Sequence, residues 1–137
     1  MKKPISTSSV FLFLALVLCS FSIPSIRAAE DLQFISTEDL SKGLKDKSLF
    51  VVDCNTPETY QKGHIPGAVH MNSSQPDEKL LPTDKKASLV FYCKNPHCMA
   101  SHEGAHFALK QGYANVRVYP LGIDGWEKAG MQTEAGK

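Results

Sequence analysis

Short apolar runs alternate with amphipathic or polar segments along most of the chain. The segments 48–54 and 87–93 are almost continuously apolar, which is typical of strands buried on both faces of a parallel sheet, and another strand is expected at 115–119. The segments between them have apolar or small residues at helical spacing. Helices are expected at 36–47, 56–63, 102–111 and 122–130. This alternation predicts an α/β fold whose parallel sheet is covered by helices on both faces.

Capping residues set the expected helix boundaries. Thr56 precedes Pro57, which favours the first position of a helix, and Gly63 ends that segment. Ser101 is expected to cap the helix at 102–111, because a serine hydroxyl can accept a hydrogen bond from the free amides of a helix N-terminus.

Two shorter strands complete the expected sheet. One lies at 34–36, and the other lies within 63–71 and leads into a polar connection that holds a single helical turn. Functional groups of parallel α/β sheets collect beyond the carboxyl ends of the strands. Cys54 and Cys93 both occupy such ends, so this edge of the sheet is where we expect a site.

The N-terminal segment is typical of a signal peptide rather than of the folded domain. Lys2 and Lys3 provide a positive start, 10–21 is an apolar run, and small residues near Ala28 offer a cleavage site. We therefore expect a signal peptide at 1–28 and an exported protein, periplasmic if the source is a Gram-negative bacterium. An uncleaved segment would instead anchor the protein to the membrane, facing the periplasm.

The charge pattern argues against two classes of partner. Without residues 1–28 the chain has 12 basic and 14 acidic side chains, so it is close to neutral. No basic stripe or run of like charge occurs in the sequence. Nucleic acid and anionic membrane surfaces require clustered positive charge and are therefore not expected as main partners. Membrane contact is expected only if the signal segment stays attached, and we expect a monomer.

Three cysteines, Cys54, Cys93 and Cys98, remain after removal of the signal segment. Export would place them in an oxidising compartment, where disulfides form. Because their number is odd, at least one thiol lacks an intramolecular partner and is a candidate reactive group. For Cys54 we expect a packed, buried thiol.

Cys93 ends a buried strand, and seven residues separate it from Ser101. This position would place its sulfur beside loop amides and a helix N-terminus, which lower the pKa of a thiol and favour the nucleophilic thiolate. Lys94, His97 and His102 would add positive charge nearby. The pattern alone leaves a functional and a structural role open for Cys93.

A series of motifs now points to a family. They are VVD ending at Asp53, GHIPGA at 63–68, GYANV at 112–116, and Gly122 followed four residues later by Trp126. With these motifs in order, residues 34–131 resemble a single-domain rhodanese, a sulfurtransferase-type domain.

The resemblance implies a three-layer sandwich in which a five-stranded parallel sheet carries helices on both faces. It also implies that Cys93 opens the active-site loop as the catalytic nucleophile. In the implied ping-pong reaction, the Cys93 thiolate takes a sulfane sulfur from thiosulfate or a persulfide and holds it as a cysteine persulfide. It then passes the sulfur to a thiol or protein acceptor. The reaction needs no metal or organic cofactor.

The remaining expected site residues surround this nucleophile. Asp53 is expected to bond loop amides or to hold the strand end, and His64 to support the site by shaping a turn. Substrate binding is implied for the loop residues Lys94, Asn95, Pro96, His97, Cys98, Met99, Ala100 and Ser101.

The sequence departs from the family pattern at positions that bind anions. The interval from Cys93 to Ser101 is eight positions instead of the usual six, and Ala100 stands where the family has an arginine. Asn55 replaces a second common arginine, and Leu121 replaces one of two paired glycines. Thiosulfate is a dianion, so the loss of two guanidinium groups argues against it as the donor. It argues more strongly against a phosphatase or arsenate reductase on this fold.

The longer loop contains Cys98, which raises a redox alternative. In this hypothesis Cys98 is a resolving thiol that attacks oxidised or persulfidated Cys93 and forms a Cys93/Cys98 disulfide. A static disulfide or a spectator thiol is the simpler explanation.

Two other readings remain. Cys93, Cys98, His102 and His106 could bind zinc or copper, but their spacing matches no standard zinc signature, and histidines on a solvated helix face are the favoured interpretation. The chain could also be a non-catalytic binding module on the same fold.

Overall fold

The computed structural model describes Lys2 and residues 32–136 of the protein. The expected signal peptide at 1–28 lies outside the described residues except for Lys2. The strands are β1 (Gln33–Phe34), β2 (Phe50–Asp53), β3 (Val69–His70), β4 (Ser88–Tyr92) and β5 (Asn115–Tyr119). The α-helices are α1 (Thr37–Lys45), α2 (Pro57–Lys62), α3 (Ala100–Lys110) and α4 (Gly122–Lys128), and η1 (Glu78–Leu80) is a 3₁₀ turn. None of the helices in this part of the chain is long and apolar enough to cross a membrane.

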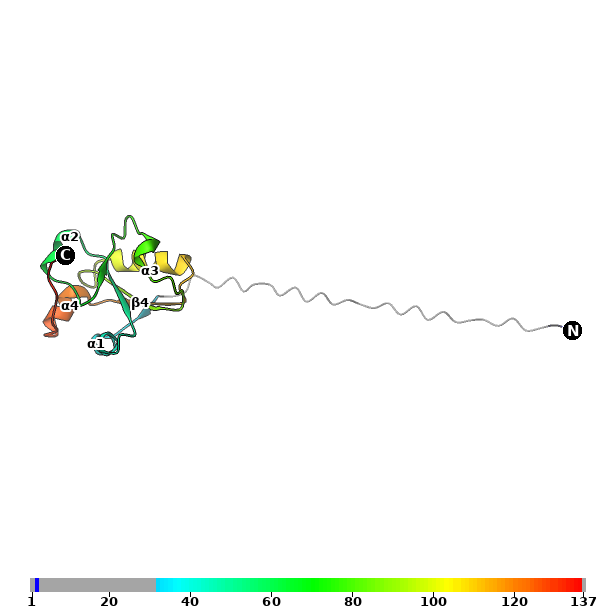
Figure 1. Ribbon diagram of the computed structural model, residues 1–137, viewed down its shortest axis with the longest axis horizontal. Helices are drawn as coiled ribbons and strands as arrows, with labels where there is room; N and C mark the ends of the chain where they lie inside the picture. The colour runs from blue at the N-terminus through cyan, green and yellow to red at the C-terminus, as the bar shows by residue number, and fades with distance from the viewer. Residues whose placement is uncertain (1, 3–31, 137) are drawn as a thin grey trace.

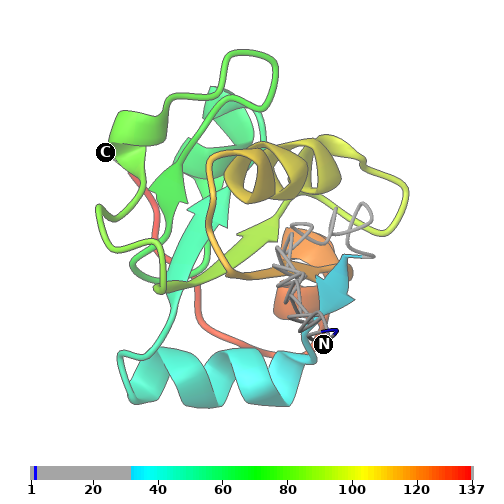
Figure 2. The ribbon, with the colours of Figure 1, turned by 90° about the vertical axis from the view of Figure 1, so that its right-hand side faces the viewer.

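The strands form one parallel sheet in the order β1-β5-β4-β2-β3. Figure 1 shows the folded part of the chain, and Figure 2 shows α1 and α3 on opposite sides of the sheet. The five-stranded parallel sheet with helices on both faces confirms the predicted fold class. In this sheet β2 and β4, which end next to Cys54 and Cys93, are neighbours.

The core has two layers because successive residues of each central strand point to opposite faces. Val52 and Phe91 pack in one layer with Ala105 of α3. Val51 and Val90 pack in the other layer, and Leu40 of α1 and Trp126 of α4 are also part of that layer. Burial on both faces explains why the central strands read as continuous apolar runs.

The register aligns the carboxyl ends of the three central strands. Asp53 is paired with Tyr92, and Tyr92 is paired with Tyr119. The Cys54 N–H donates to the carbonyl of Tyr92 at 2.8 Å and extends this ladder by one residue. Cys54 and Cys93 therefore leave the sheet at the same edge.

Most predicted helix ends are confirmed, but the prediction for Ser101 is wrong. Thr56 caps α2, whose first residue is Pro57. The N-cap of α3 is Met99, which makes no side-chain capping bond, and the helix begins at Ala100. Ser101 lies inside the first turn and is 2% exposed. Its Oγ lies 3.3 Å from Cys93 Sγ, so the hydroxyl faces the thiol rather than the helix amides.

Candidate active site

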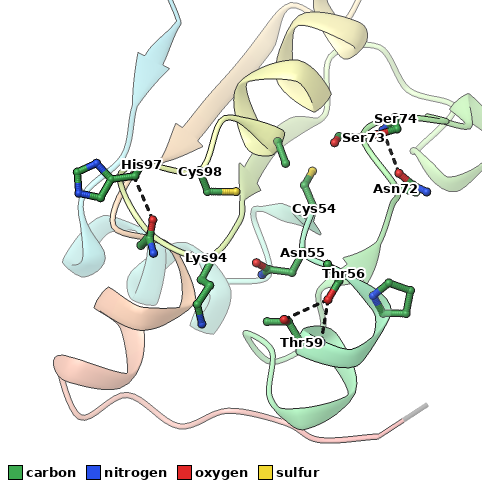
Figure 3. A pocket seen from close by; sticks show the side chains of 13 residues that line it. Cys54, Asn55, Thr56, Thr59, Asn72, Ser73, Ser74, Lys94, His97 and Cys98 are labelled. Carbon is green, nitrogen blue, oxygen red and sulfur yellow. Dashed lines mark hydrogen bonds between the residues drawn. The ribbon is translucent and has the colours of Figure 1, made fainter.

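A cavity of about 490 Å³ opens at the carboxyl edge of the sheet. Its lining comes from the turn between β2 and α2, from residues 72–74 after β3, and from the loop between β4 and α3. Figure 3 shows these three segments facing one another around the cavity. The site therefore lies where the topology of a parallel α/β sheet predicts it.

The loop between β4 and α3 contributes only part of the predicted substrate-binding set. The loop residues that line the cavity are Lys94, Asn95, His97 and Cys98, and Ala100 at the start of α3 also lines it. Pro96, Met99 and Ser101 do not line it, and neither does Cys93. The backbone of this loop, rather than its sequence, decides which side chains reach the cavity.

Cys93 lies beneath the loop and is 2% exposed. Its thiol donates to the carbonyl of Cys98, with 3.0 Å between Sγ and the oxygen. Burial raises the pKa of Cys93, and a hydrogen bond to the Cys98 side chain raises it further, against smaller lowering effects from the Ser101 hydroxyl and amide. Cys93 in this arrangement is a protonated, covered thiol.

Cys98 is partly exposed and lines the cavity. Burial by itself raises the pKa of Cys98, but three hydrogen bonds outweigh it and lower the pKa below the usual thiol value. The donors are the Cys93 thiol and the backbone N–H groups of Lys94 and Ala100. Amides that stabilise a thiolate in this way resemble the anion sites formed by loops and helix N-termini. Loop amides were expected beside the Cys93 sulfur, but only the Ser101 amide lowers the pKa of Cys93, whereas the backbone of Lys94 and Ala100 acts on Cys98.

Cys54 forms part of the opposite wall. Figure 3 shows the Cys54 and Cys98 side chains pointing toward one another across the cavity. Burial raises the pKa of Cys54 well above the usual thiol value, and the negative charge of Asp53 raises it further. A Cβ atom added to Gly104 of α3 would lie 2.9 Å from Cys54 Sγ, so the thiol is tightly packed. Cys54 is the packed, buried thiol that was expected.

The side-chain amide of Asn55 has an unpaired N–H donor group. The residue is 8% exposed and lines the cavity, and its Nδ2 makes no hydrogen bond at normal distance to the described residues. The Asn55 side chain lowers the pKa of Asp53, so the amide lies near that carboxyl but not at hydrogen-bond distance. An unsatisfied buried N–H group is unfavourable, so a ligand acceptor in the cavity would stabilise it. Sequence reasoning treated Asn55 only as a lost arginine.

Asp53 holds the strand end rather than the active-site loop. Its carboxylate accepts hydrogen bonds from the Asn55 N–H at 2.7 Å and from the Tyr92 hydroxyl at 2.5 Å. The Tyr92 oxygen in turn accepts the N–H of Ile65 at 2.9 Å. Burial raises the pKa of Asp53, although these hydrogen bonds oppose it. The two alternatives for Asp53 are thereby decided in favour of the structural one.

His64 lies in a separate polar cluster. Its Nδ1 bonds the carbonyl of Tyr60 at 2.9 Å, and its ring stacks on the Tyr60 ring with centroids 3.9 Å apart. Its backbone pairs with that of Glu134 near the C-terminus. His64 therefore shapes the turn before β3, as expected, and it is not among the cavity-lining residues.

The N-terminal turn of α4 anchors the loop, a feature that sequence reasoning missed. The N–H of Ile123 donates to the carbonyl of Cys93 at 2.9 Å, and the N–H of Asp124 donates to that of Lys94 at 3.0 Å. Gly122 permits this approach because a Cβ atom there would lie 2.4 Å from the Lys94 backbone. The GxxxW spacing was a signal for the family, but the sequence did not indicate this contact.

Positive charge at the cavity is sparse. Lys94 is the one lining residue with a permanent charge, and its Nζ lies 3.3 Å from Asp124 Oδ1. The His97 ring points away from Cys98 (Figure 3). Residues 32–136 contain one arginine, Arg117, which belongs to β5 and does not line the cavity. The site therefore has weak electrostatic attraction for a dianion.

Of the two histidines of α3, His106 lies outside the thiol site, whereas His102 Nδ1 lies 3.5 Å from the Ser101 hydroxyl, which contacts Cys93 Sγ. The His102 ring is 6.1 Å from the ring of Phe34 and partly exposed, and His106 is exposed. Among the residues that the structure describes, no three histidine, cysteine or acidic side chains are grouped closely enough to hold a metal.

Comparison with known proteins identifies the class to which this fold and site belong. Residues 36–129 match the family of the rhodanese-like domain, so the chain belongs to that family.

Solved structures agree with this assignment. A Bacillus halodurans protein is 25% identical with a TM-score of 0.69, over 75% of this chain and 77% of the other. Thiosulfate sulfurtransferase from Pseudomonas aeruginosa is 22% identical with a TM-score of 0.67, over 77% of this chain and 21% of the other. The 3-mercaptopyruvate sulfotransferase SseA from Escherichia coli is 18% identical with a TM-score of 0.65, over 77% and 51% of the two chains. At these identities the two enzymes share the fold with this chain.

Proposed function

We propose that the protein is a sulfurtransferase that carries a sulfane sulfur as a persulfide on Cys93 and delivers it to a thiol or protein acceptor. The observation that carries the proposal is the pairing of two cysteines beside a cavity in a rhodanese-like domain: the Cys93 thiol donates to the Cys98 carbonyl at 3.0 Å, and Cys98 lines the cavity. A thiolate is the form of cysteine that attacks sulfur, and the loop amides stabilise one within this pair.

The electrostatics of the cavity favour a persulfide over thiosulfate as the donor. Lys94 already forms an ion pair with Asp124, and Ala100 stands in place of an arginine. A dianion would lose its hydration without gaining bidentate guanidinium contacts. A persulfide has its charge on sulfur, and the unpaired Nδ2 of Asn55 in the cavity wall can donate to its polar groups.

The overall transfer is balanced without an oxidant or a cofactor. The donor R–S–S⁻ loses its sulfane sulfur and leaves as R–S⁻, while a protein thiolate becomes a persulfide. An acceptor thiolate then attacks the outer sulfur of that persulfide, and the protein thiolate is regenerated. The sulfane sulfur keeps its oxidation state throughout.

The test is sulfur transfer from cysteine persulfide to a thiol acceptor, with mass spectrometry of the protein during turnover. The wild type should gain one sulfur atom on Cys93, and Cys93→Ser should lose transfer almost completely. A Cys93→Ser variant that folds and retains wild-type transfer would contradict the proposal. Thiosulfate should be a much poorer donor than cysteine persulfide for the wild type.

A second candidate function, a thiol redox cycle, is favoured by the contact between the two cysteines, since the Cys93 thiol donates to the Cys98 carbonyl at 3.0 Å. In that cycle an oxidant accepts two electrons from the pair, a disulfide forms, and an external dithiol reduces it again. Mild oxidation followed by mass spectrometry tests it: loss of two hydrogens, localised to a Cys93–Cys98 crosslink that a dithiol reverses, would support this function. Persistence of both free thiols under oxidation would eliminate it.

Export and the acceptor are part of the proposal and rest on the sequence. The positively charged, apolar segment at 1–28 would direct the protein out of the cytoplasm, so its acceptor would be an exported thiol or protein. N-terminal sequencing of the protein isolated from its own cells tests this: a start near residue 29 supports cleavage, whereas an intact Met1 in a membrane fraction supports the anchor.

A further inference from the structure

We propose that sulfur reaches Cys93 through Cys98: the Cys98 thiolate attacks the donor first and then transfers the sulfane sulfur to the thiol beneath it. This relay rests on the proposed sulfurtransferase function and defines the order in which its two thiols act. The family resemblance implies Cys93 as the nucleophile, so Cys98 would be a further catalytic residue that belongs to this longer loop.

Access to the cavity separates the two thiols. Cys98 lines the cavity, and Figure 3 shows its sulfur pointing into it. Cys93 is 2% exposed and contacts the Cys98 carbonyl at 3.0 Å and the Ser101 hydroxyl at 3.3 Å. A donor in the cavity meets Cys98 Sγ before it can reach Cys93 Sγ. Direct attack by Cys93 would first require the loop to move.

The protonation states of the two thiols also favour Cys98 as the first nucleophile. The Cys93 side chain and the backbone of Lys94 and Ala100 lower the pKa of Cys98 and favour its thiolate form. Burial and the Cys98 side chain raise the pKa of Cys93, whose thiol donates to the Cys98 carbonyl at 3.0 Å. The accessible sulfur is thus also the better nucleophile in the resting protein.

The opposite wall offers a place for the rest of the donor. Asn55 presents the buried Nδ2 group that has no hydrogen-bond partner at normal distance among the described residues, and Lys94 supplies the charge on the loop side. Both belong to the cavity that Cys98 lines. A donor with a carboxylate or carbonyl near its persulfide could therefore bond Asn55 while its outer sulfur faces Cys98. A small amino-acid persulfide has this chemistry.

The two steps of the relay balance. In the first, Cys98–S⁻ attacks the outer sulfur of R–S–S⁻, whose S–S bond breaks, so that Cys98–S–S⁻ forms and R–S⁻ leaves. In the second, the Cys93 thiol, which lies beside the Cys98 backbone, gives its proton to the inner Cys98 sulfur and attacks the outer sulfur, and the S–S bond of the Cys98 persulfide breaks. Cys93–S–S⁻ and Cys98–SH result, and Cys98 later loses its proton to solvent. No electrons enter or leave.

The relay can be tested by adding one equivalent of cysteine persulfide to the full protein under anaerobic conditions. Rapid quenching and peptide mass spectrometry would locate the added sulfur over time. In the wild type the sulfur should be found first on Cys98 and then on Cys93. In Cys93→Ser and Cys93→Ala it should remain on Cys98. In Cys98→Ser the loading of Cys93 should slow by about tenfold or more, because the accessible thiolate is gone.

A matched control is His106→Ala, which changes an exposed side chain of α3 outside the cavity. This variant should take up sulfur like the wild type. A second readout needs no sulfur donor. Iodoacetamide at neutral pH should alkylate Cys98 of the folded wild type about tenfold faster than Cys93, since alkylation follows thiolate content and access.

The possible failures are distinguishable. Unchanged loading of Cys93 in a folded Cys98→Ser variant would overturn the relay while leaving the sulfurtransferase intact. Alkylation of Cys93 at least as fast as Cys98 would do the same. A wild type that gains sulfur on no cysteine would overturn the proposed function, and the relay with it.

Discussion

Cys54 follows β2 and Cys93 follows β4, so two cysteines leave neighbouring parallel strands at the same edge of the sheet. After Cys54 the chain turns at once into α2, and Asp53 bonds back to the Asn55 amide. After Cys93 a loop of residues 94–99 precedes α3 and brings a third thiol, Cys98, back over the strand end.

The comparison shows that the position at a strand end does not by itself make a thiol reactive. Burial keeps Cys54 and Cys93 protonated, and the pKa of each lies above the usual value. Cys98 has a lowered pKa because its loop brings the sulfur close to the Cys93 thiol and to the backbone of Lys94 and Ala100. The extra length of the loop therefore matters more than the strand position: it supplies both the amides and the exposure.

The largest expected effect comes from the anchor of the β4 loop. Gly122→Ala should destabilise the protein by about 3 kcal/mol, because the new Cβ would clash with the Lys94 backbone and the residue has φ of 64°. Urea unfolding measures this. Gly112→Ala is the matched control: Gly112 has φ of 91° but open space around its Cβ position, so about 1 kcal/mol is expected. Equal losses in the two variants would show that the clash with the loop is unimportant.

A smaller loss of stability is expected from overpacking the thiol that follows β2. Gly104→Ala should destabilise the protein by about 1–2 kcal/mol, since the Cβ would lie 2.9 Å from both Cys54 Sγ and a ring carbon of Phe91, and overpacking outweighs the gain in helix propensity. A double-mutant cycle with Cys54→Ala checks the cause, because removal of Sγ should recover part of the loss. Strict additivity of the two free energies would contradict a contact between these residues.

Asp53 at the end of β2 should make the free energy of unfolding depend on pH. This effect should be smaller still and confined to acidic pH. Burial raises the pKa of Asp53 above its usual value of 3.8, so the folded chain holds this proton to higher pH than the unfolded chain does. This contribution to stability is complete below the unfolded pKa and is lost as the pH rises through the folded pKa. Asp53→Asn should remove that component from the free energy of unfolding. A variant with the same pH profile as the wild type would contradict it.

The smallest effect is expected for the ion pair at the rim of the β4 loop. Asp124→Asn should change stability by at most about 0.5 kcal/mol, because Lys94 and Asp124 are both exposed and solvent screens their interaction. Thermal unfolding at low and high salt measures it, and the small difference should shrink at high salt. A loss as large as that of Gly122→Ala would mean that the side chain, rather than the backbone of α4, holds the loop.

Much of the fold could be predicted from the sequence because its signals are local. Apolar runs such as 48–54 predicted the central strands, and Thr56 with Pro57 predicted the start of α2. Ser101 was misassigned because the same hydroxyl can cap a helix or contact a thiol, and only the folded loop selects between them. Asn55 was missed as a site residue because its unpaired Nδ2 is a property of the surrounding packing.

The sequence by itself determined the alternation of strands and helices, the family, and the presence of three cysteines near one edge of the sheet, since these depend on residue types and spacing. Tertiary structure decided which thiol is covered and which is exposed, and to which sulfur the loop amides point. The reason is physical: exposure and the pKa of a thiol depend on atoms from β4, α3 and α4 that meet only in the folded protein.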